Sequence, residues 1–120
     1  MLRPIPARIL RSTAIVDVCS AVDMYQNQTY TQYIVSKVHI QPTAQIRKTV
    51  NNTDQQLKSI LFVDARLSEP HLDWTALFES AHNLGGDLRV TVRGVTYTAM
   101  AVDALRDDTD ELHHYEIALA

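Results

Sequence analysis

Residues 88–102, LRVTVRGVTYTAMAV, decide the fold class of this chain. Apolar and polar residues alternate from Leu88 to Val92, which is the period of a β-strand with one buried face. Arg93-Gly94 fits a two-residue turn, and residues 95–102 return with β-branched and aromatic side chains. The stretch therefore predicts an antiparallel β-hairpin.

A short helix is predicted just before this hairpin, over about residues 73–82. Asp73 is a suitable N-terminal cap, and Gly85-Gly86 supplies the glycine with which helices commonly end. The apolar residues of this segment recur at positions i, i+3, i+4 and i+7 of one helix face, namely Trp74, Leu77, Phe78 and Ala81.

Four further segments have the composition and alternation of strands: residues 12–24, 29–40, 57–65 and 112–119. Alternation places Cys19 on the face opposite Ala14 in the first segment, and it places Ile34 with Val38 on one face of the second. Six strands and one helix predict a single mainly β domain over residues 1–120. We expect a small antiparallel β-barrel or closed sandwich, because closure removes exposed strand edges. No helix follows each strand, which excludes a parallel α/β sheet.

Residues 41–56, QPTAQIRKTVNNTDQQ, form a long polar loop between two of these strands. Connections above about 12–15 residues are uncommon in compact domains and are usually functional or disordered. The polar side chains can pair with further copies of the segment or with a neighbouring sheet edge, and the alternative is a mobile loop without a function. The candidate assembly residues are Gln41, Arg47, Lys48, Asn51, Asn52, Asp54, Gln55 and Gln56.

Residues 1–11 are predicted to form an extended arm, because Pro4 and Pro6 disfavour a helix there. Arg3, Arg8 and Arg11 make the arm locally basic, and we expect it to dock on the domain or on a neighbour. The net charge of the whole chain is −3, which argues against affinity driven mainly by nucleic-acid phosphates. No apolar run approaches the roughly 20 residues needed to span a bilayer, so no membrane partner is expected.

Three residues near the C-terminus have side chains that can bind metals. His114 and Glu116 would share one strand face while His113 faces the other way, so the three cannot converge on one ion by themselves. His114 and Glu116 are weak metal candidates, and the polar face of an amphipathic strand is the favoured explanation of both. The acidic run at residues 107–111 lacks the spacing and the internal glycine of a Ca²⁺ loop and predicts a turn.

Catalytic signatures are not found in the sequence. Cys19 has no evident base beside it, and no serine lies in a glycine-flanked elbow. The three glycines are all explained by turns, which leaves no glycine-rich phosphate loop. We therefore expect no catalytic residues, no enzymatic activity and no cofactor.

Several short motifs occur in a fixed order along the chain: the Pro4–Pro6 opening, Thr29-Tyr30, Leu61-Phe62-Val63-Asp64, Val95-Thr96-Tyr97 and the ending His113-His114-Tyr115-Glu116-Ile117-Ala118-Leu119. With these motifs the chain resembles the minor capsid proteins of tailed bacteriophages and prophages, which act as head–tail connectors of the stopper type. The ending is the most specific of the motifs, and the resemblance covers nearly the whole length.

The resemblance implies a virion protein that forms a homo-oligomeric ring in the neck, below the portal and adaptor, after assembly in the bacterial host cytoplasm. It implies that residues 41–56 project toward the central channel, near packaged DNA, and that the N-terminal arm contacts a neighbouring subunit or the adaptor ring. Tail proteins would attach to the same ring. Two alternatives stay open: a tail-completion or tail-terminator subunit, and a non-viral β-barrel that binds a ligand or a metal through His114 and Glu116.

Overall fold

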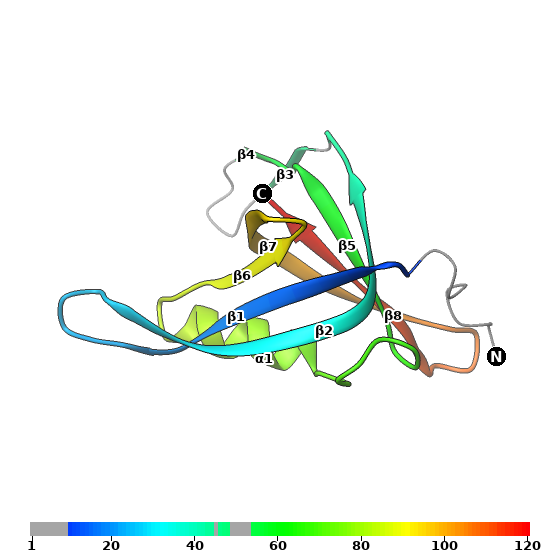
Figure 1. Ribbon diagram of the computed structural model, residues 1–120, viewed down its shortest axis with the longest axis horizontal. Coiled ribbons are helices and arrows are strands. Elements are labelled where there is room, and N and C mark those ends of the chain that lie inside the picture. The colour runs from blue at the N-terminus through cyan, green and yellow to red at the C-terminus, as the bar shows by residue number, and fades with distance from the viewer. Residues whose placement is uncertain (1–9, 45, 49–53) are drawn as a thin grey trace.

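The computed structural model describes residues 10–44, 46–48 and 54–120. Six antiparallel strands form a closed barrel in the order β1-β2-β5-β8-β7-β6, and β6 pairs with β1 to complete the ring (Figure 1). The prediction of a mainly β fold with six antiparallel strands and one short helix is confirmed. The barrel strands are β1 (Ser12–Val22), β2 (Gln28–Pro42), β5 (Ser59–Asp64), β6 (Leu88–Val92), β7 (Val95–Arg106) and β8 (Leu112–Leu119).

The hairpin of β6 and β7 turns where the sequence predicts it. Val92 and Val95 are partners at the end of the ladder, and Arg93 and Gly94 between them have φ angles of 53° and 79°. Two consecutive positive φ angles give a turn whose twist matches that of the paired strands. Strand β7 then continues to Arg106, four residues beyond the predicted end at Val102, because its outer half pairs with β8.

Helix α1 (Trp74–Asn83) packs against β1, β6 and β7. The Asp73 side chain accepts a hydrogen bond from the Ala76 N–H at 3.1 Å, as expected of an N-terminal cap. At the other end Gly85, with a φ of +81°, donates its N–H to the His82 carbonyl. Trp74 and Ala81 are buried in the barrel core, so the predicted helix and its buried face are confirmed.

One prediction of side-chain direction is wrong, and it fails at an irregularity of the β1–β2 ladder. Ile34 is 62% exposed, whereas its neighbour Val35 is fully buried. Lys37 has a φ of +58°, and the register shifts between the pairs Ser12–Val38 and Ala14–Val35. One extra residue of β2 at this bulge reverses the alternation on its two sides.

Cys19 occupies the outward position that the alternation predicts, and it is nevertheless buried. The connection between α1 and β6 crosses over it, and the Cys19 N–H donates to the Asp87 carbonyl at 3.0 Å. The ladder also shifts register between Cys19 and Ala21. Coverage by a loop from elsewhere in the chain has no signature in the local sequence pattern.

Gly86 lies against Cys19 so closely that a larger residue would not fit. A Cβ atom on Gly86 would touch Cys19 Sγ, lie 2.6 Å from Cys19 Cβ and lie 2.9 Å from Gln28 Oε1. That oxygen also accepts the Asp87 N–H at 2.9 Å, so displacing it would loosen the α1–β6 connection.

We therefore expect Gly86→Ala to lower the free energy of unfolding by about 1–3 kcal/mol, the usual range for overpacking a tight site. Urea denaturation followed by tryptophan fluorescence measures the change. Gly85→Ala is the matched control: it meets no atom within 4 Å but carries a positive φ, so it should cost only about 1 kcal/mol. Equal losses for the two variants would contradict the contact with Cys19.

Candidate functional site

The polar segment between β2 and β5 contains a small sheet of its own. Strands β3 (Ile46–Lys48) and β4 (Asp54–Gln56) form a two-stranded antiparallel sheet that is separate from the barrel. The long loop predicted for residues 41–56 thus carries a short hairpin, which we call the polar ribbon. In Figure 1 it lies at the end of β5 near the C-terminus, apart from the side of the barrel that α1 covers.

The base of the polar ribbon is fixed to the barrel. Pro42 and Ser59 are ladder partners, and the Thr43 N–H donates to the Lys58 carbonyl at 3.0 Å, one step beyond them. Leu57, between β4 and β5, is only 2% exposed. The ribbon is therefore held by paired backbone on one side and by a buried side chain on the other.

The predicted assembly residues of this segment are distributed over the ribbon and its base. The register places Arg47 opposite Gln55 and Lys48 opposite Asp54. Gln41 is exposed at the end of β2, and Gln56 is exposed at the end of β4. Asn51 and Asn52 lie outside the described residues.

The N-terminal arm is described only from Leu10 onward, so Arg3 and Arg8 lie outside the described residues. Leu10 is 3% exposed and attaches the chain to the barrel directly before β1. Arg11, the next residue, is exposed. The contact that this arm makes with other molecules stays a prediction.

His113, His114 and Glu116 form a chain of contacts along β8. His114 Nδ1 lies 2.7 Å from His113 Nδ1, and His114 Nε2 lies 3.0 Å from Glu116 Oε2. Both ring nitrogens of His114 therefore already have a protein partner. Strict alternation predicted that His113 faces away from His114. The β7–β8 ladder shifts register between the pairs Leu105–His114 and Arg106–Leu112, which makes His113 an extra residue of β8, and the two rings meet edge to face.

The same histidine belongs to a row of rings that sequence reasoning missed. Phe62 lies between His39 and His114, with ring centroids 5.7 Å and 6.1 Å away. The three residues come from neighbouring strands β2, β5 and β8 on the outer face of the barrel. Only the strand order, which the sequence did not supply, brings them together.

The acidic run at residues 107–111 forms the turn between β7 and β8, as predicted. The Thr109 hydroxyl and the N–H groups of Thr109 and Glu111 all donate to Asp107 Oδ1. These bonds, the Thr109 hydroxyl above all, lower the pKa of Asp107 to about 2. The carboxylate is thus used to shape the turn.

The tip of the β1–β2 hairpin, residues 23–27, begins earlier than the turn that the polar residues 26–28 predict. Met24 and Tyr25 at this tip are 84% and 78% exposed. The predicted strand ran through Met24, but β1 ends at Val22 because Asp23 opens a turn: its Oδ1 accepts the N–H groups of Tyr25 and Asn27 at 2.8 Å and 2.9 Å. The Asn27 N–H is the main reason that the pKa of Asp23 is lowered.

A groove, which we call the Tyr115 groove, lies at the other end of the barrel. It consists of a hollow of about 200 Å³ and a wider one of about 520 Å³ that share the lining residues Asp73, Leu112 and Tyr115. Burial, and secondarily the charge of Asp73, raises the pKa of Tyr115. The lining combines apolar residues such as Leu72 and Leu112 with the charged residues Asp73, Glu79 and Arg106. Such a surface can bind a side chain that is largely apolar and carries one donor.

The described residues contain no group of three or more histidine, cysteine or acidic side chains placed to hold a metal ion. In the same part of the chain, no helix is long and apolar enough to cross a membrane. What the structure does present is a set of surfaces: the polar ribbon, the hairpin tip and the Tyr115 groove. Surfaces of this kind suit assembly with other proteins.

Comparison with known proteins also indicates a role in assembly. Residues 6–119 match the model of a family described as minor capsid protein. No curated protein and no solved structure matches the chain. The family match spans nearly all of the 120 residues, and it implies a structural role in the virion rather than an enzymatic one. The chain therefore belongs to the minor capsid protein family and is a structural protein of a phage virion.

Proposed function

We propose that this minor capsid protein is a head–tail connector of the stopper type. Identical copies form a ring in the neck below the portal and adaptor, close the DNA channel with residues 41–56, and offer the surface to which the tail attaches. The polar ribbon carries this proposal, because it is an additional two-stranded sheet that takes no part in the barrel.

A channel gate needs a segment that can reach away from the domain while the domain stays folded. The polar ribbon meets this requirement, because the barrel ladder is complete up to Pro42 and Ser59 at its base. The core residues lie in the barrel and in α1. Movement of the ribbon therefore does not require the core to open.

The charges of this segment favour closure by obstruction. Residues 41–56 contain two basic side chains, Arg47 and Lys48, and one acidic side chain, Asp54. The register places Lys48 opposite Asp54. A segment with nearly balanced charge neither repels DNA strongly nor binds its phosphates strongly. We infer that copies of the ribbon fill the channel rather than hold DNA by charge.

The basic arm, with Arg3, Arg8 and Arg11, serves in this proposal as a contact to the neighbouring subunit or to the adaptor ring. Leu10 anchors it at the start of β1. Figure 1 shows the start of β1 on the side of the barrel remote from the hairpin tip.

Virions assembled without this protein test the proposed function. We expect heads that package DNA, lose it afterwards and carry no tails, which electron microscopy and nuclease protection of the packaged DNA detect. Empty heads that never packaged DNA would contradict the stopper role. Heads that keep their DNA but carry unfinished tails would instead identify a tail-completion subunit.

A further inference from the structure

We propose that neighbouring copies of this chain join head to tail, with the hairpin tip of one copy seated in the Tyr115 groove of the next. This inference rests on the ring of the proposed function and names the contact that would build it. The two surfaces are different patches on one chain, so the contact is heterologous. Heterologous contacts generate rings when the rotation between copies closes.

The hairpin tip is a preformed apolar projection. Met24 and Tyr25 place two large side chains almost entirely in solvent. The turn beneath them is held by five hydrogen bonds that join Asp23 with residues at positions 25–27, including the Gln26 N–H to the Asp23 carbonyl at 3.1 Å. Little conformational entropy is lost when such a turn binds, because it is already ordered.

The Tyr115 groove has the chemistry that this projection requires. Its walls contain apolar side chains from three parts of the chain, among them Val63, Pro70, Leu72 and Leu112. Asp73 contributes a carboxylate to the lining of both hollows, and a carboxylate can accept a hydrogen bond from a phenol hydroxyl. Met24 and Tyr25 together offer apolar surface and one such hydroxyl.

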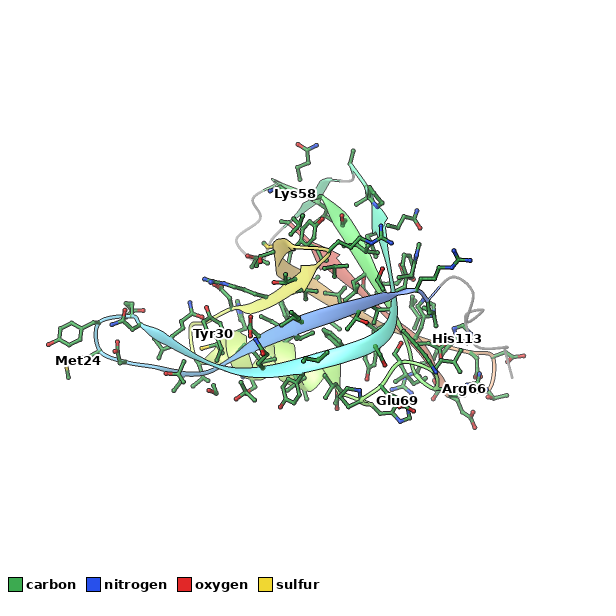
Figure 2. The ribbon with its side chains drawn as sticks, in the orientation of Figure 1. Met24, Tyr30, Lys58, Arg66, Glu69 and His113 are labelled. Carbon is green, nitrogen blue, oxygen red and sulfur yellow. The ribbon has the colours of Figure 1, made fainter. Side chains whose placement is uncertain are left out.

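The two surfaces lie at opposite ends of the molecule. Figure 2 places Met24 at one end of the longest axis and Arg66, Glu69 and His113 toward the other. These three residues are sequence neighbours of residues that line the groove, such as Ala65, Pro70 and Leu112. That axis measures 46 Å, against 30 Å and 29 Å for the other two. Copies joined in this way would run along the circumference of a ring, and the polar ribbon, which lies beside this axis in Figure 1, would stay available for the channel.

A pair of engineered cysteines tests the contact in assembled particles. Met24→Cys, which keeps Tyr25, is combined with His71→Cys in the lining of the Tyr115 groove. The native Cys19 is buried and stays out of the reaction. After mild oxidation we expect a ladder of covalent oligomers on a denaturing gel. Each single variant should stay monomeric, as should Met24→Cys with Ser80→Cys, an exposed position outside the groove lining.

Other outcomes overturn the inference. Dimers from Met24→Cys alone would mean that tips meet each other, and a ladder only with Ser80→Cys would mean that the tip contacts the helix surface. Monomers from every variant, in particles that retain their DNA, would reject this contact and leave the connector role intact. The deletion experiment above tests that role separately, because its outcome depends on the packaging phenotype and not on which surfaces touch.

Discussion

Replacement of residues 45–56 by Asn-Gly is expected to give virions that package DNA and then lose it. The barrel should fold normally, because Thr43 and Lys58 are already hydrogen-bonded and Leu57 is retained in its buried position. Asn-Gly supplies the tight turn that a two-stranded ladder requires. The subunit should therefore enter the neck but lack the segment that obstructs the channel.

The measured quantities are infectious titre and the fraction of packaged DNA that resists nuclease. Both should fall to the level of particles that lack the protein. A matched variant of full length, with Arg47, Lys48 and Asp54 all changed to Ser, should keep most of the protected DNA, because obstruction does not depend on charge. Loss of DNA in this variant but not in the shortened one would show that the charges, and not the bulk of the ribbon, hold the DNA.

Trp74→Ala is expected to produce the largest loss of stability of any single substitution considered. Trp74 is the largest fully buried side chain, and it joins α1 to the barrel core. Removal of a buried aromatic side chain costs about 3–5 kcal/mol, through lost transfer free energy and the cavity that remains. Domains of this size have a total stability of about 5–15 kcal/mol, so the variant should be close to unfolding at 37 °C. Thermal unfolding followed by circular dichroism measures the shift.

Trp74→Phe separates packing from hydrogen bonding at this position. Within the described part of the chain, the buried indole Nε1 has no hydrogen-bond partner. Phenylalanine therefore removes an unsatisfied polar group while it keeps much of the apolar volume, and it should cost clearly less than alanine. Losses of equal size for the two variants would mean that the indole N–H has a partner in the folded protein.

Local sequence patterns were sufficient to predict the barrel strands and the helix. The alternation from Leu88 to Val92, the Arg93-Gly94 turn and the Asp73 cap all act within a few residues, and each is found where it was predicted. The direction of Ile34 and the burial of Cys19 could not be predicted in the same way. Ile34 depends on a bulge at Lys37, and Cys19 depends on a loop about 67 residues farther along the chain that covers it.

The candidate surfaces could likewise be predicted only in part from the sequence. The polar segment was conspicuous from its composition, whereas its internal pairing of Ile46 with Gln56 was not, because three-residue strands carry almost no periodic signal. The Tyr115 groove joins α1 to the start of β8, and its lining could only be recognised from the assembled fold. At the hairpin tip, two large residues beside Asp23 were a local signal for an exposed turn, but the predicted strand was extended through Met24.

A structure of the assembled virion neck tests the central claim most directly. The connector account predicts a closed ring of this chain below the portal and adaptor, with residues 41–56 of every copy directed toward the channel axis and narrowing it. Residues 41–56 on the outer circumference of the ring, with the channel open at that level, would contradict the account.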